Sequence, residues 1–146
     1  MIKILYTTYY SNLKQLPDNS IKITVSRYPP IRPSKYPNIK HCKGLAPTIG
    51  LYRDYIKHSS IDWETFKERY YNQMENNRIT QKYLNLIHEH VALKKNDIIL
   101  ICYEKNFNKC HRSLIAKKID VPWSKKYEKY EENKKQMSIE EECKNG

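Results

Sequence analysis

Glycine is scarce in this chain, because only three of its 146 residues are glycine. Phosphate-binding P-loops, and the loops that hold methyl donors, need several glycines at fixed spacing. No stretch of the sequence has that spacing, so these nucleotide-binding classes are excluded. Collagen, in which every third residue is glycine, is excluded as well.

Paired cysteine motifs and long apolar runs are also missing. The four cysteines stand at positions 42, 102, 110 and 143 without a Cys-x-x-Cys pair, which favours free thiols over a disulfide framework. No apolar run approaches the roughly 20 residues that span a bilayer. Residues 1–6 are too few and too polar for a signal peptide, so the sequence predicts a cytoplasmic protein without a membrane segment.

Positive charge is in excess. The chain has 27 lysines and arginines against 16 aspartates and glutamates, which gives a formal net charge of +11. Residues 124–146 contain six lysines and six glutamates, so the whole excess lies in residues 1–123. Such a surface attracts polyanions and favours a nucleic acid or a nucleotide as the partner, although a lysine-rich composition can also serve solubility alone.

Three segments are predicted to be strands. Residues 2–10 and 21–26 are rich in β-branched and aromatic side chains, and residues 97–102 form a short continuous apolar run. A run of that kind is typical of a strand buried on both faces of a parallel sheet. Residues 28–37 contain four prolines and are expected to form an extended loop.

Helices are predicted between these strands and after the last one. The expected helices cover residues 47–56, a segment that begins at Ser60 or Asp62, residues 80–93 and residues 110–119. Within the second of them, four apolar side chains at helical spacing are expected to face the core: Trp63, Phe66, Tyr70 and Met74. The length fits one domain. The sequence therefore predicts a small three-layer α/β domain over residues 1–123, with a mainly parallel sheet, and a charged tail over residues 124–146.

The carboxyl edge of the predicted sheet can be located in the sequence, and ligands bind at this edge in parallel α/β folds. It should carry residues 7–10, Ser26 with Arg27, and residues 103–112. The last segment ends at a predicted helix start, where free backbone N–H groups favour an anion and lower the pKa of a thiol. Cys110 is therefore a candidate catalytic thiolate, with a buried structural cysteine as the alternative.

Two elements of the sequence resemble those that mark the uncharacterised-function family four-eight-eight. They are Ser26-Arg27-Tyr28-Pro29-Pro30, and Cys102-Tyr103-Glu104-Lys105 followed by Cys110-His111-Arg112. The resemblance covers about residues 2–123. It implies a compact α/β domain in which the two elements face one another, and it implies little about the reaction.

Metal binding and thiol chemistry are alternative interpretations of the cysteines and histidines. His41, Cys42, Cys110 and His111 could meet at a zinc ion, but adjacent ligands rarely reach one metal, so neither a metal centre nor a cofactor is expected. A Cys110–His111 nucleophile pair is disfavoured, because neighbours on a helix point in different directions. A redox role of Cys102 and Cys110 stays open.

The catalytic candidates are Glu104 and Cys110. A carboxylate just past a buried strand can activate water or stabilise an oxocarbenium ion, although Glu104 could instead form a salt bridge. Tyrosines that stack on bases and cations that contact phosphate supply the expected binding groups. The binding candidates are Tyr9, Tyr10, Ser26, Arg27, Tyr28, Tyr103, Lys105, His111 and Arg112.

These candidates lead to two functional hypotheses. The first is an enzyme that processes nucleic acid or nucleotides, in its concrete form by cleaving the N-glycosidic bond of a flipped-out DNA base. The alternative is a non-catalytic protein that binds a nucleotide or nucleic acid, for example an accessory or anti-defence factor.

Overall fold

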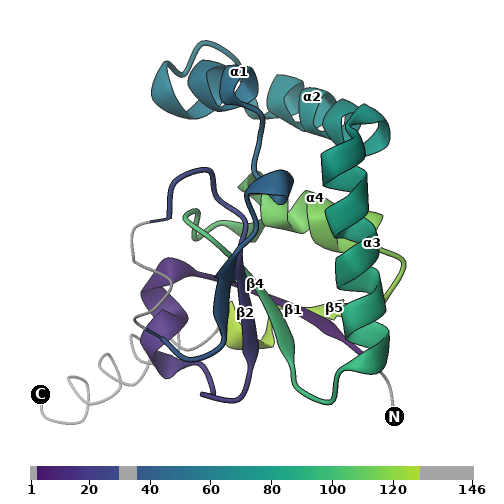
Figure 1. Cartoon of the computed structure of the whole chain (residues 1–146). Coiled ribbons are helices and arrows are strands. Elements are labelled where there is room, and N and C mark those ends of the chain that lie inside the picture. Colours follow the sequence, from purple (N-terminus) through teal and green to yellow (C-terminus); the bar gives the residue numbers. More distant parts are fainter. Residues whose placement is uncertain (1–2, 30–35, 129–146) are drawn as a thin grey trace, which may run out of the picture.

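The computed structural model describes residues 3–29 and 36–128. Its centre is a five-stranded sheet in the order β3-β2-β4-β1-β5, in which all pairs of neighbouring strands are parallel (Figure 1). The strands are β1 (Leu5–Tyr9), β2 (Ile21–Thr24), β3 (Ile39–His41), β4 (Ile98–Cys102) and β5 (Trp123–Ser124). The predicted α/β class with a parallel sheet is therefore confirmed.

The central strands end together at one edge of the sheet. Tyr9 at the end of β1 lies opposite Cys102 at the end of β4, and Thr24 at the end of β2 lies opposite Ile101. The loops that follow β2 and β4 therefore leave the sheet side by side. Strand β4 is buried along its whole length, as its continuous apolar sequence predicts.

The described residues form four α-helices. They are α1 (Ile49–Tyr52), α2 (Trp63–Asn76), α3 (Arg78–Leu93) and α4 (His111–Lys118). Helices α2, α3 and α4 pack on one face of the sheet, while α1 and the π-helix that continues it, Arg53–Lys57, stand over the carboxyl ends of the strands (Figure 1). Asp62 caps α2 through the backbone N–H of Thr65, and Asn77 caps α3.

The core between these helices and the sheet contains the predicted apolar stripe of α2. Phe66, Tyr70 and Met74 are buried, and Trp63 packs against the same cluster. Gly44, in the 3-10 helix Lys43–Leu45, lies so close to α3 that an added Cβ would stand 2.3 Å from the ring of Tyr83. Only glycine fits this approach.

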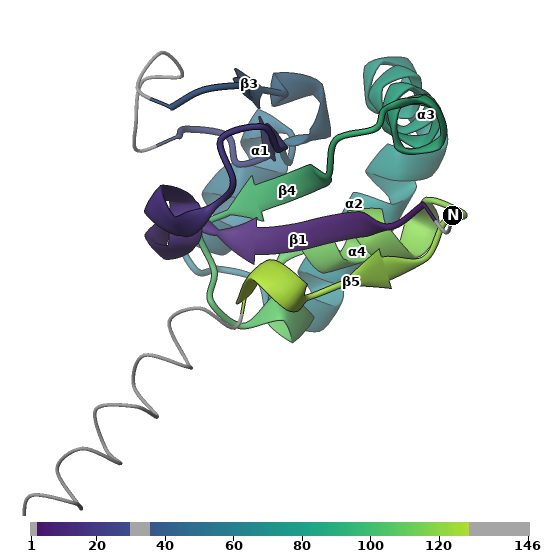
Figure 2. The ribbon, with the colours of Figure 1, turned by 90° about the horizontal axis from the view of Figure 1, so that it is seen from below.

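The other face of the sheet carries a thinner layer. Two 3-10 helices, η1 (Tyr10–Gln15) and η6 (Lys126–Glu128), lie against it; Figure 2 shows η1 as the purple coil after β1 and η6 as the yellow-green coil after β5. Leu13 from η1 and Tyr127 from η6 pack against Ile99 and Ile101 of β4. The third layer of the domain is therefore made of 3-10 helices.

Several elements differ from the expectation. Strands β3 and β5 were not predicted, and the helix expected over residues 47–56 is one α-turn followed by a π-helix. Residues 124–128, which the sequence analysis assigned to the tail, pack against β1 through η6. The rest of the proposed tail, residues 129–146, and the centre of the proline-rich loop, residues 30–35, lie outside the described residues.

In the part of the chain that the structure describes, no helix is both long and apolar enough to span a membrane.

Candidate functional site

A pocket of about 340 Å3 opens at the carboxyl edge of the sheet. Its walls come from three regions that are distant in sequence: the segment after β2, the α1 region with α2, and the segment from the end of β4 to the start of α4. The lining residues are Ser26, Arg27, Tyr28, Pro47, Tyr52, Tyr55, Ile56, Phe66, Cys102, Tyr103, Glu104, Lys109, Cys110 and His111. The two sequence elements that carry the family resemblance therefore both contribute to the lining of this pocket.

Aromatic rings form one wall of the pocket. The ring of Tyr55 lies 4.4 Å, centroid to centroid, from the ring of Phe66, and the ring of Tyr28 meets that of Tyr52 edge to face at 5.2 Å. Tyr28 is 56% exposed. A pocket of this size with aromatic walls and a few polar groups suits a small planar ligand.

A chain of tyrosines braces the mouth of the pocket. The hydroxyl of Tyr103 donates to the carbonyl of Tyr28 at 2.6 Å, and the Tyr103 ring packs edge to face against Tyr10. The Tyr10 hydroxyl in turn lies 2.6 Å from that of Ser26, and burial raises the pKa of Tyr10 well above its usual value. These contacts tie the segment after β2 to the segment after β4.

Arg27 brings a positive charge to the pocket wall. Its Nη1 donates to the carbonyl of Pro47 at 3.3 Å, and its Nε is buried with no hydrogen-bond partner among the described residues. Among the described residues the buried Nε of Arg112 lacks a partner as well, so it is the place of Arg27 in the pocket lining that allows this guanidinium to donate to a bound molecule. Lys109, which also lines the pocket, is exposed and adds a second cation.

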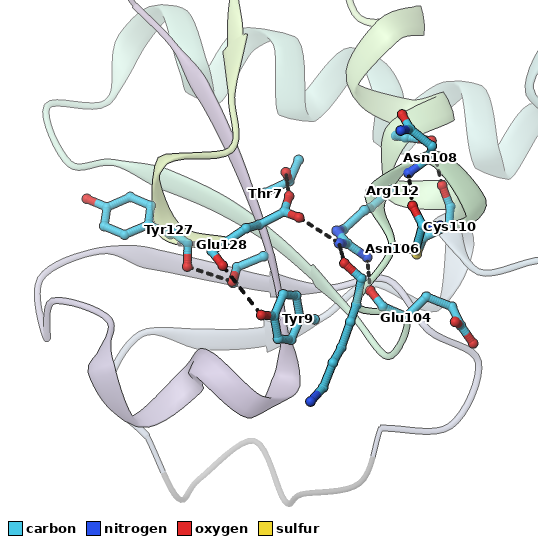
Figure 3. A network of polar contacts seen from close by, with 12 residues as sticks. Thr7, Tyr9, Glu104, Asn106, Asn108, Cys110, Arg112, Tyr127 and Glu128 are labelled. Carbon is cyan, nitrogen blue, oxygen red and sulfur yellow. Dashed lines mark hydrogen bonds and ion pairs between the residues drawn. The ribbon is translucent and has the colours of Figure 1, made fainter. Parts of the chain in front are cut away.

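Glu104 is an exposed residue whose side chain lines the pocket. Figure 3 shows its carboxylate pointing away from Arg112, whereas its backbone carbonyl faces that arginine. The carboxylate is therefore not used in the buried network on the other side of the loop, which takes only the backbone carbonyl of this residue.

Two cysteines and a histidine form the floor of the pocket. Cys102 ends β4, while Cys110 and His111 begin α4, and all three are buried. The Sγ of Cys102 lies 3.6 Å from Nδ1 of His111, and Nε2 of His111 lies 2.7 Å from the carbonyl oxygen of Val25. The ligand-capable atoms of the three residues all lie within 4.8 Å of one another.

Local backbone geometry explains why Cys110 and His111 can act together, which corrects the sequence argument against such a pair. That argument assumed that both residues lie in the helix. Cys110 is the N-cap of α4 and has extended backbone angles, φ −129° and ψ 141°. Its side chain is therefore not rotated away from His111 as it would be inside a helix.

The two thiols at the floor have different acidities. Burial raises the pKa of the Cys102 thiol well above its usual value. Burial acts in the same direction on Cys110, but hydrogen bonds from Cys102 and His111 and the charges of His111 and Arg112 bring the pKa of Cys110 well below its usual value. Cys110 is therefore the more readily ionised thiol.

Arg112 lies on the far side of this loop, in a closed polar network (Figure 3). The side chain is fully buried and forms a 2.9 Å ion pair with Glu128. It also donates to the carbonyl oxygens of Glu104 and Lys105, and the hydroxyl of Thr7 donates to Glu128. Arg112 therefore fixes the loop that carries Glu104 and does not line the pocket.

The predicted site residues thus divide between the two sides. The pocket brings together seven of them: Ser26, Arg27, Tyr28, Tyr103, Glu104, Cys110 and His111. Tyr10 supports the mouth from behind, whereas Tyr9 is buried beside Arg112, with its ring 5.8 Å from the guanidinium carbon. The exposed Lys105 is not among the lining residues.

Sequence reasoning missed the aromatic wall. Tyr52, Tyr55 and Phe66 come from the α1 region and α2, and none of them was among the candidate site residues. Cys102 was not among the candidate site residues. Its position at the end of a buried strand was the available signal that it lies at the ligand-binding edge.

A comparison with models of protein families identifies the family of this chain. The family model DUF488-N3a, described as the active DUF488-N3 subclade, matches residues 5–121. The chain belongs to the DUF488 family. The match to DUF488-N3a extends from the start of β1 to the segment before β5, so it includes every residue that lines the pocket. Searches of curated proteins and of solved structures found no match.

Proposed function

We propose that this protein is a nucleic-acid processing enzyme that binds a single flipped-out base in the pocket and cleaves its N-glycosidic bond. The observation that carries the proposal is the aromatic pocket at the carboxyl edge of the sheet, with Arg27, Lys109 and Glu104 among its lining residues. The net charge of +11 supports a polyanionic partner.

The size and lining of the pocket support a single base. Its volume of about 340 Å3 lies at the lower end of the roughly 300–1,000 Å3 of small-molecule sites. A duplex cannot enter such a space, so a base would have to leave the stack. Tyr28, Tyr52 and Tyr55 supply rings on which a base can stack with little dependence on its identity.

The charged groups have separate roles in this proposal. Arg27 and Lys109 would contact the phosphates that flank the base, since guanidinium and ammonium groups donate to phosphate oxygens. Glu104 would take a proton from a water molecule while the oxygen of that water forms a bond to the sugar C1′. The C1′–N bond breaks, and the base leaves with the bonding electrons and takes up a proton from solvent, while Glu104 returns the proton of the water molecule to solvent. A carboxylate also stabilises the oxocarbenium-like transition state of such a reaction.

The test is base release from single-stranded DNA and RNA that contain all bases. The full chain is incubated with each oligonucleotide, released bases are separated by chromatography, and abasic positions are cut with alkali. We expect release by the wild type and at least about a 100-fold loss in Glu104→Gln, the size typical of removing a general acid or base. Oligonucleotide binding should be unchanged in this variant.

A matched variant controls for the loss of one negative charge. Glu89 is exposed on α3, away from the pocket lining, so Glu89→Gln should release bases at the wild-type rate. Retained turnover in Glu104→Gln would remove Glu104 from the mechanism. Tight binding with no base release by the wild type would replace this proposal by the non-catalytic alternative.

A further inference from the structure

We propose that Cys102, Cys110 and His111 form a binding site for a thiophilic divalent metal ion, Zn2+ in the first place, with one coordination position open to the pocket. The carrying observation is the convergence of two sulfur atoms and one ring nitrogen, all within 4.8 Å of one another, at the pocket floor. This inference goes beyond the proposed base cleavage and does not depend on it.

The donor set and its spacing match zinc. Zinc binds cysteine sulfur at about 2.3 Å and histidine nitrogen at about 2.0–2.1 Å in tetrahedral geometry, which places a sulfur and a nitrogen ligand roughly 3.5 Å apart. Nδ1 of His111 lies 3.6 Å from Sγ of Cys102. Two thiolates and a neutral imidazole would also balance the charge of a divalent ion in this buried position.

The imidazole ring of His111 is oriented in the way that is common for histidines that bind metal ions. Its Nε2 lies 2.7 Å from the carbonyl oxygen of Val25, which can only accept, so Nε2 carries the proton and donates. In the neutral ring, Nδ1 then keeps its lone pair and faces Cys102. A hydrogen bond from the second ring nitrogen to a backbone carbonyl is the common way of orienting a histidine ligand.

Packing and hydrogen bonds hold the three residues in place. Cys102 ends the buried strand β4, and the carbonyl of Cys110 accepts a hydrogen bond from the Ser113 hydroxyl at 2.7 Å. The ring of Tyr70, itself fully buried, packs edge to face against His111 at 5.3 Å. A metal ion would therefore find its ligands preorganised.

The pocket leaves room for a fourth ligand. All three side chains line it, so the open position would face the space in which a ligand binds. Three protein ligands with a free fourth position are typical of catalytic zinc sites, whereas structural sites are closed by four. The fourth ligand would be a water molecule or a donor atom of the bound molecule.

The test uses Co2+ as a spectroscopic substitute for Zn2+. The full chain, without an affinity tag, is treated with a chelator and reduced, and Co2+ is then titrated under anaerobic conditions. We expect one Co2+ to bind per chain and to give the visible bands of tetrahedral Co2+ together with a thiolate-to-metal charge-transfer band. Added Zn2+ should displace the Co2+, so that all of these bands disappear. Zn2+ should also raise the Tm of the wild type, and the rise should increase with the Zn2+ concentration because the ion binds the folded state.

Variants locate the site. Cys102→Ser, Cys110→Ser and His111→Ala should each weaken Co2+ binding at least about 100-fold and abolish the tetrahedral bands. Cys42→Ser is the matched control, because Cys42 is a partly buried thiol outside the cluster, and it should bind like the wild type.

The proposal is wrong if the wild type shows neither these bands nor a Tm shift at a tenfold excess of metal. The three residues would then form a hydrogen-bonded thiol–imidazole cluster. It is also wrong if the Cys42 variant loses the bands while the Cys110 variant keeps them. Base release plays no part in these readouts, so the metal site and the proposed function can fail independently.

Discussion

The loop between β4 and α4 has two sides that are built in opposite ways. On one side, Arg112 is fully buried, ion-paired with Glu128 and hydrogen-bonded to the carbonyls of Glu104 and Lys105. On the other side, Arg27 lines the pocket, and its Nη1 donates to the carbonyl of Pro47 at 3.3 Å. One side is a closed network, and the other can accept a ligand.

The difference teaches how to interpret the Cys-His-Arg element. Three consecutive residues look like one functional unit in the sequence, yet Cys110 and His111 face the pocket while Arg112 faces the closed network. The arginine holds the loop through its carbonyl groups, whereas the thiol of Cys110 and the imidazole of His111 line the pocket. A stability experiment and a binding experiment should therefore separate them.

The largest expected effect is on stability, in Arg112→Ala. This change leaves Glu128 buried without its cation and two loop carbonyls without their donor, and breaking a buried ion pair costs about 3–5 kcal/mol. The measurement is the free energy of unfolding in urea. The control is Arg69→Ala, which breaks an exposed 2.7 Å ion pair with Asp54 and should cost about 0–1 kcal/mol.

Equal losses in the two arginine variants would contradict the closed-network account. So would an Arg112 variant that keeps wild-type stability but loses ligand binding, because Arg112 would then belong to the site.

The next effect is on binding, in Tyr55→Ala. Tyr55 forms part of the aromatic wall and packs against Phe66. Removing a ring on which a base stacks weakens binding by about 1–3 kcal/mol, or roughly 5–150-fold. The measurement is the affinity for a fluorescent single-stranded oligonucleotide, with circular dichroism to check the fold. An unchanged affinity would remove Tyr55 from the binding surface.

The smallest effect is expected in Tyr9→Phe, on the closed side. The hydroxyl of Tyr9 contacts the carbonyl of Glu128 at 3.4 Å, so its loss should lower the free energy of unfolding by about 0.5–1.5 kcal/mol. Oligonucleotide affinity should not change, because Tyr9 lies outside the pocket lining. A loss of affinity in this variant would mean that the two sides of the loop are not independent.

The sequence predicted the elements whose patterns are local. Strand β4 is a continuous apolar run, and the stripe on α2 repeats at helical spacing, so both could be recognised without tertiary information. Strand β3 has three residues and β5 has two, which is too short for any periodicity. The pairing of each with a neighbouring strand is what makes it a strand.

The same limit applies to the candidate site. The sheet edge located Ser26, Arg27 and Glu104 correctly at the pocket, since strand order along a parallel sheet implies a shared carboxyl edge. The aromatic wall depends on how α1 stands over that edge, which no local pattern reports. The role of Arg112 depends on Glu128, a residue that composition assigned to the tail.

The most direct test of the central claim is fluorescence anisotropy of labelled single-stranded DNA and RNA across a range of salt concentrations, with wild type and Arg27→Ala. If the pocket is a defined site, the wild type should still bind near physiological salt, and Arg27→Ala should weaken binding by about 1.5–3 kcal/mol through the loss of charge-assisted hydrogen bonds. If binding instead disappears with modest salt and Arg27→Ala behaves like the wild type, the attraction comes from the overall charge alone. That result would contradict a nucleic-acid site in this pocket.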